Sequence, residues 1–180
     1  MMLLYVYFIS LVIINVKGSG MIPRCIQHRS SIATFNTPQY SGNVYFTKHD
    51  SYLHVTGSVS GLPPDKMLGV HIHEYGALGD DCNDAGPHFN PFNSDHGGLT
   101  GQPRHPGDFG NLYVNHGGVM NFNLTVDISS IIEHDGFIGR ALVIHEQEDD
   151  LGRMGNEGSR KTGNSGKRLT CAVVGIWKAK

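Results

Sequence analysis

Hydrophobic and polar positions alternate along short stretches of this chain, as they do in strands with one buried face. Between residues 119 and 126, Val119, Asn121 and Asn123 alternate with Met120, Phe122 and Leu124. Sustained helical periodicity is absent. Stretches rich in β-branched and aromatic residues predict strands at residues 31–35, 43–47, 52–59, 68–74, 112–115, 119–126, 138–145 and 169–177. The pattern therefore predicts one all-β domain over residues 31–180, an eight-stranded Greek-key β-barrel or sandwich.

Two segments interrupt this succession of strands. Residues 76–110 and 146–168 have little strand character and are dense in Gly, Asp, Asn and His. Long loops without regular structure are uncommon in compact domains and are usually functional. We interpret both as functional loops.

The N-terminal segment differs from the rest of the chain. Residues 3–14 are apolar apart from Ser10 and are followed by small residues, which is typical of a signal peptide. The run is too short for a comfortable membrane span. We predict a signal peptide over residues 1–18 with cleavage near 18–20, then an extension over 19–30. An uncleaved anchor is the alternative, because no Lys or Arg precedes the apolar run. The mature protein is expected to be secreted, without a membrane span.

Charge and cysteine content refine this prediction. The formal net charge is -2 and no long basic run is present, so no nucleic-acid partner is expected. The chain has three cysteines, which in an oxidising compartment predicts a disulfide and one remaining thiol. The tripeptide Asn123-Leu124-Thr125 is a possible glycosylation site.

Histidines carry the strongest chemical signal. In Val70-His71-Ile72-His73 the two imidazoles share one face of a strand. Other candidates follow in the first loop and at the end of a later strand: His88, His96, His105, Asp108 and His145. Six histidines and one aspartate exceed the needs of one ion. Two neighbouring sites are the simpler interpretation, zinc with imidazoles and a carboxylate, and copper with four imidazoles. These residues alone leave open which histidine belongs to which site.

Several long motifs occur together in order. They are His-Ile-His-Glu-Tyr-Gly at 71–76, Ala-Gly-Pro-His-Phe-Asn-Pro at 85–91, His-Gly-Gly at 96–98, Arg-His-Pro-Gly-Asp at 104–108, Gly-Arg-Ala-Leu-Val-Ile-His-Glu at 139–146 and Gly-Asn-Ser-Gly-Lys-Arg-Leu-Thr-Cys at 163–171. From residue 31 to 176 the chain resembles the copper/zinc superoxide dismutase family, in a secreted, extracellular form. The resemblance implies an enzyme that disproportionates superoxide to dioxygen and hydrogen peroxide, in antioxidant defence outside the cell.

The same resemblance implies a role for each motif residue. Copper would be bound by His71, His73, His88 and His145, and zinc by His88, His96, His105 and Asp108, with His88 shared between a redox-cycling copper and a structural zinc. Arg168 would attract the superoxide anion beside the copper, and Glu157 and Lys161 would shape its approach. Asp149 would hydrogen-bond one histidine of each site, and Cys82 and Cys171 would form the disulfide.

The resemblance also implies a homodimer, through residues 138–139 and the strand at 172–177. Two other functions compete with dismutation. A copper carrier commonly lacks copper ligands or the arginine, and here all of them are present. A zinc hydrolase needs an open zinc position and a general base. The four implied zinc ligands would close that position, so dismutation is the favoured interpretation.

Overall fold

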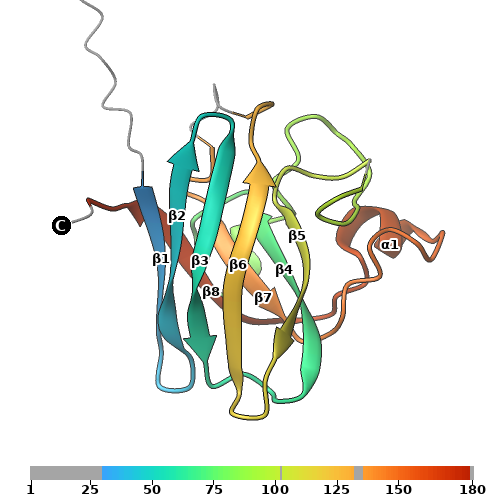
Figure 1. The fold of residues 1–180 in the computed structure, drawn as a ribbon. Helices are drawn as coiled ribbons and strands as arrows, with labels where there is room; N and C mark the ends of the chain where they lie inside the picture. The colour runs from blue at the N-terminus through green and yellow to red at the C-terminus, as the bar shows by residue number, and fades with distance from the viewer. Residues whose placement is uncertain (1–29, 102, 132–135, 179–180) are drawn as a thin grey trace, which may run out of the picture.

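The computed structural model describes residues 30–101, 103–131 and 136–178. Within them, eight antiparallel strands close into a barrel (Figure 1). The strands are β1 (Ser30–Asn36), β2 (Ser41–His49), β3 (Tyr52–Ser60), β4 (Lys66–His73), β5 (Asp108–Val114), β6 (Val119–Asp127), β7 (Ala141–His145) and β8 (Arg168–Ile176). The all-β, eight-stranded prediction is confirmed.

The order of strands around the barrel is β1-β2-β3-β6-β5-β4-β7-β8. Besides the closing pair β1 with β8, two pairs, β3 with β6 and β4 with β7, are not consecutive in sequence, and such crossings are typical of a Greek key. Pairing of Ala33 in β1 with Val174 in β8 closes the ring and removes the free strand edges.

Alternate residues of each strand fill the interior. Val44 and Phe46 in β2, Val55 in β3 and Phe122 in β6 are buried, and their sequence neighbours are more exposed. Burial of each such side chain contributes about 1.5–3 kcal/mol to folding, before conformational entropy is subtracted. The resulting rigid core positions the loops that carry the site.

Strand ends differ from the prediction at several places. The strand expected at 112–115 begins earlier, at Asp108, because its first residues pair with β4 across an irregularity between Val70 and His71. The strand expected at 138–145 begins only at Ala141, because a turn precedes it in which Arg140 N donates to Phe137 O. Apolar pattern alone does not reveal these turns.

The second long loop contains a helix that the sequence did not predict. Helix α1 covers Glu157–Thr162, begins after Asn156, whose side chain accepts from Ser159 N at 2.8 Å, and ends at Gly163 with φ +65°. A helix of six residues is too short to produce a hydrophobic period. The first loop likewise contains one 3-10 turn, Asn83–Ala85.

Both loops lie on the same side of the barrel (Figure 1). They are joined where His96 N donates to Arg160 O at 2.7 Å. No helix in the described part of the chain is long and apolar enough to cross a membrane.

Candidate metal centre

Seven buried side chains converge between the barrel and the two loops. His71 and His73 come from β4, His145 from β7 and Asp108 from the first residue of β5. His88, His96 and His105 come from the first loop. Val70 and Ile72 point into the core, as expected from alternation. His71 and His73, which alternate with them, point to the opposite face. The loops cover that face, which is why His71 and His73 are buried as well.

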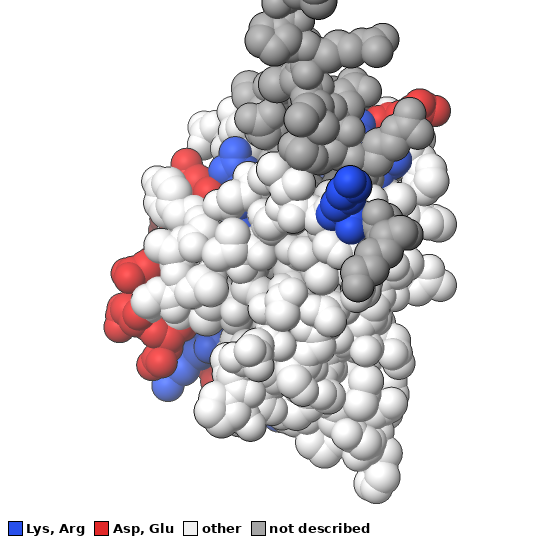
Figure 2. Space-filling view, turned by 90° about the vertical axis from the view of Figure 1, so that its left-hand side faces the viewer, with Lys and Arg blue, Asp and Glu red and all other residues white. Residues whose placement is uncertain are grey.

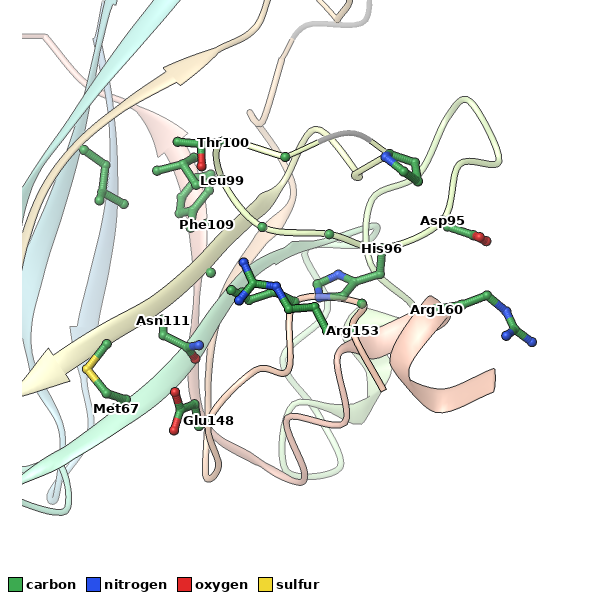
Figure 3. Close-up of a pocket in the computed structure, with 18 of the residues that line it drawn as sticks. Met67, Asp95, His96, Leu99, Thr100, Phe109, Asn111, Glu148, Arg153 and Arg160 are labelled. Carbon is green, nitrogen blue, oxygen red and sulfur yellow. The ribbon is translucent and has the colours of Figure 1, made fainter. Parts of the chain in front are cut away.

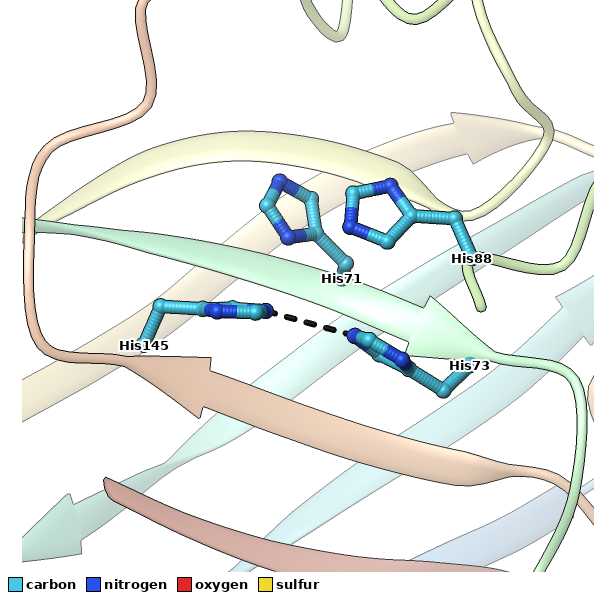
Figure 4. A group of neighbouring side chains, drawn as sticks. All are labelled: His71, His73, His88 and His145. Carbon is cyan, nitrogen blue, oxygen red and sulfur yellow. Dashed lines mark hydrogen bonds between the residues drawn. The ribbon is translucent and has the colours of Figure 1, made fainter. Parts of the chain in front are cut away.

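The first group of donors consists of four histidines (Figure 4). One ring nitrogen from each of His71, His73, His88 and His145 lies within 4.8 Å of the others. The Nε2 atoms of His73 and His145 lie 3.2 Å apart. One nitrogen of each ring can therefore reach a common point, and these are the four residues that the family resemblance assigns to copper.

The second group surrounds Asp108. Its Oδ1 lies 3.3 Å from His88 Nδ1, 3.0 Å from His96 Nδ1 and 3.2 Å from His105 Nδ1. A zinc ion at about 2.0–2.1 Å from four tetrahedral donors requires donor separations of roughly 3.3 Å. The spacing therefore suits zinc. One nitrogen of His71 also falls within 4.8 Å of donors from His88, His96 and Asp108, so the two groups adjoin.

Five of the six histidines use one ring nitrogen to donate to a protein oxygen outside the two donor groups. Such a partner fixes the tautomer and leaves the other nitrogen free for a metal. Two of these hydrogen bonds go to Asp149, from His71 Nε2 to Oδ2 at 2.9 Å and from His96 Nε2 to Oδ1 at 2.8 Å. The other three go to backbone oxygens, from His73 Nδ1 to Gly86 O at 2.8 Å, from His145 Nδ1 to Gly166 O at 3.3 Å and from His105 Nε2 to Ser94 O at 3.0 Å. Asp149 thus joins the two groups.

His88 is the exception. Its Nδ1 faces Asp108 and His105 in the second group, and its buried Nε2 has no hydrogen-bond partner. The same holds for His71 Nδ1, which is also buried without a partner. An unsatisfied buried nitrogen is costly, and metal coordination would satisfy each of them. The donor set therefore fits copper and zinc, with His88 facing both groups.

The protonation states agree with metal binding. Burial lowers the pKa of His71, His73 and His88, and that of His145 to about 3, so these rings are neutral donors. Burial alone would raise the pKa of Asp108, but hydrogen bonds from the histidines around it hold that pKa well below its usual range. Burial alone would lower the pKa of His96, yet hydrogen bonds to Asp108 and Asp149 raise it to about 9.

Comparison with known proteins decides the family. The model of the family described as copper/zinc superoxide dismutase (SODC) matches residues 40–174. The chain belongs to the copper/zinc superoxide dismutase family. Its activity is superoxide dismutation, its cofactors are copper and zinc, and these predictions from sequence are confirmed.

Relatives support the secreted type. The extracellular superoxide dismutase [Cu-Zn] of Schistosoma mansoni is 58% identical over 146 residues, which cover 81% of this chain and 79% of the relative. That of Drosophila melanogaster is 44% identical over 140 residues, covering 77% of each protein. The crystal structure of the clock protein EA4 matches with a TM-score of 0.77 and 41% identity, covering 83% of this chain and 95% of the other. This dismutase is therefore of the extracellular type.

Asp149 in this dismutase is itself held by neighbours that sequence reasoning missed. Asn111 in β5 donates from Nδ2 to Asp149 O and accepts from Asp149 N, both at 2.7 Å. A Cβ on Gly163 would lie 1.9 Å from Asp149 Oδ1 and 2.5 Å from His96 Nε2, so only glycine fits there. Gly163 was visible as part of a family motif, but nothing in a single sequence connects Asn111 to Asp149.

Arg168, the first residue of β8, lies next to the four-histidine group. It donates to Cys82 O and Gly86 O, each at 2.6 Å. Its positive charge adds to burial in lowering the pKa of His73 and His145, so it lies close enough to these rings to act on them. The guanidinium is only partly buried, so it can meet an anion from solvent.

The predicted disulfide between Cys82 and Cys171 is present, with a Cα–Cα distance of 6.0 Å. It joins residues 89 apart and fixes the first loop to β8. Closing a loop of this length stabilises the fold by about 4–5 kcal/mol in the chain-entropy model. Because Cys82 O accepts from Arg168, the disulfide also helps to position that side chain. The third cysteine, Cys25, lies outside the described residues.

The second loop also carries charged side chains at the surface. Glu157 and Lys161 form an exposed ion pair at 2.6 Å along α1. A separate pocket of about 810 Å³ lies where the two loops meet β4 and β5 (Figure 3). His96, Glu148 and Arg153 are among its lining residues, and Arg153 reaches across it (Figure 3).

Proposed function

We propose that this dismutase binds copper through His71, His73, His88 and His145, and zinc through His88, His96, His105 and Asp108. The observation that carries this assignment is the His88 ring. Its Nδ1 faces the Asp108 group, its Nε2 is unpartnered, and neither nitrogen donates to an acceptor outside the two groups. When bound, copper supplies the one-electron redox change that the disproportionation of superoxide requires.

The protein's own groups then have distinct tasks. Asp149 orients His71 and His96 so that their Nδ1 atoms face the metal sites. The Nε2 of His88 can hold a proton whenever it is not bound to metal, so this ring could supply a proton during dismutation. The complete donor set together with Arg168 favours turnover over copper carriage, and the four donors around zinc leave no open position for hydrolysis.

Arg168 is proposed to attract superoxide, and its replacement tests this. Arg168→Ala should lower kcat/KM at low salt by roughly tenfold or more, because steering of a charged substrate contributes factors of that size. Arg168→Lys should restore part of the rate. Stopped-flow measurement of superoxide decay at several salt concentrations, with metal content determined on each sample, provides the readout.

Lys167→Ala is the matched control, since it removes an exposed positive charge from the adjacent position. An unchanged rate in Arg168→Ala with full metal content would refute the proposed role. Glu157 and Lys161 are proposed to guide superoxide more weakly, because their exposed charges oppose each other at short range. Lys161→Ala should therefore change the salt dependence less than Arg168→Ala does.

A homodimer is the proposed assembly, with β8 and residues 138–139 in the interface. Val173 and Ile176 in β8 are 37% and 54% exposed. β1, which pairs with β8, has no charged residue, and Figure 2 shows that this side of the molecule is largely uncharged. An exposed apolar surface with few charges is typical of an interface between copies.

Val173→Asp should convert the dimer into a monomer, because it would bury two uncompensated carboxylates at a symmetric contact. Sedimentation velocity at micromolar protein measures the change. Met154→Asp is the control, since Met154 is 68% exposed on the second loop. A wild-type protein that sediments as a monomer would contradict the proposal.

Processing of the chain is also proposed from its sequence. The signal peptide is proposed at residues 1–18 and the extension at 19–30, and of these only Ser30 belongs to the described residues. Asn123 and Thr125 are both exposed on the outer face of β6, so a glycan at Asn123 is compatible with the fold. Mass spectrometry of the protein secreted by eukaryotic cells should show an N-terminus near residue 19 and a mass loss on enzymatic deglycosylation. Asn123→Gln should abolish that loss and Asn121→Gln should not, whereas a loss that persists in Asn123→Gln would refute this site.

A further inference from the structure

Two exposed histidines lie side by side on the barrel, outside the metal centre. His49 is the last residue of β2, and His54 lies in β3, across the turn that joins these strands. Their ring centroids are 5.8 Å apart and the rings are nearly perpendicular, at 82°. In the strand register His49 is opposite Tyr52, and His54 is opposite Thr47. The two imidazoles are therefore diagonal neighbours on the same outward face.

The spacing of these rings matches that of rings that converge on a metal. In the buried centre, the centroids of His73 and His145 are 5.4 Å apart, and those of His88 and His145 are 6.1 Å apart. The separation of His49 and His54 lies between these values. Two imidazoles at this distance are close enough for one nitrogen of each to reach a shared ion.

The strand neighbours of the two rings do not oppose a cation. The outward neighbours of the two rings in β2, β3 and β6 are Thr47, Tyr52, Thr125 and Asp127. The only charged residue among these four is Asp127, an acid. Lys48 lies on the opposite face of β2, the face from which Val44 and Phe46 enter the core. A bound divalent ion would thus meet no lysine or arginine at these outward positions.

We propose that His49 and His54 form a third metal site, an exchangeable surface site that binds one divalent transition-metal ion per chain and prefers Cu²⁺. Imidazole suits copper, nickel and zinc, and Cu²⁺ binds most strongly to a given set of nitrogen donors. Water completes the coordination, because the site is open to solvent. Two exposed donors hold an ion more weakly than the four buried donors of either centre, so this ion exchanges while the centre stays loaded.

Titration calorimetry of the fully loaded dismutase with Cu²⁺ tests the proposal, using His49→Ala, His54→Ala and His116→Ala variants. His116 is the control, an exposed histidine that contacts Asp65 and no second imidazole. We expect one additional Cu²⁺ per chain in the wild type and in His116→Ala, and binding at least about tenfold weaker when either donor is lost. Dismutase activity and thermal stability should stay unchanged in all three variants.

Two results would overturn the proposal. One is a wild-type protein that takes up no additional Cu²⁺. The other is an additional ion whose affinity is the same in His49→Ala and His54→Ala as in the wild type, which would place it on other groups of the chain. Electron paramagnetic resonance of the added Cu²⁺ provides an independent readout, because loss of one imidazole changes its nitrogen hyperfine pattern.

Discussion

Replacing His88 with alanine is expected to abolish superoxide dismutation and to weaken the binding of copper and zinc together. His88 presents a different nitrogen to each donor group, with Nδ1 3.3 Å from Asp108 Oδ1 and Nε2 free. Loss of an outer-shell partner costs metal sites about 10–100-fold, and loss of a direct ligand to two sites should exceed that, so activity should fall by more than about a hundredfold. Metal analysis after dialysis and an assay of superoxide decay measure both effects.

Two single variants give this experiment its specificity. His145→Ala should lose copper and keep zinc, because His145 belongs only to the four-histidine group. His105→Ala should weaken zinc first, because His105 Nδ1 contacts the Asp108 group. If His88→Ala loses only one of the two metals, the proposal that both metals share this ring is wrong.

Changing Asp149 to asparagine should lower metal affinity by about 10–100-fold without a change of shape. The carboxylate accepts from His71 Nε2 through Oδ2 and from His96 Nε2 through Oδ1. An amide keeps one acceptor and presents an N–H to the other ring. That ring must then accept at Nε2, so its proton moves to Nδ1, the atom that faces the metal. Competition with a chelator, followed by metal analysis, measures the loss for copper and zinc separately.

Glu148→Gln is the matched control, because it makes the same chemical change at the neighbouring exposed position. It should keep wild-type metal affinity. Circular dichroism establishes that both variants fold. Wild-type affinity for both metals in Asp149→Asn would show that the bridge does not orient the ligands, and would contradict this part of the account.

The sequence predicted much of this molecule because its signals were local or came in motifs. Alternation such as that in β6 identifies a strand from its own residues, and all the expected strands are present. The donors of the two groups were identified because they stand within long motifs. Without the resemblance, the residues left open which donors belong to which ligand set, because the spacing of residues in the first loop does not give the path of that loop over the barrel.

What escaped prediction depends on contacts between distant segments. Asn111 holds Asp149 across a sequence separation of 38 residues, and no local pattern indicates this. Helix α1 forms because Asn156 caps it and Gly163 ends it inside a loop that packs on the first loop, not because of an apolar face. The burial of His71 and His73 likewise comes from the loops that cover them, whereas alternation predicts only their direction.

Anomalous diffraction from crystals of the metal-loaded dismutase, recorded at the copper and zinc absorption edges, tests the central claim most directly. The account predicts one copper peak among His71, His73, His88 and His145, and one zinc peak among His88, His96, His105 and Asp108, on opposite sides of the His88 ring. A His88 ring that contacts only one peak, or a copper peak away from its four histidines, would contradict it.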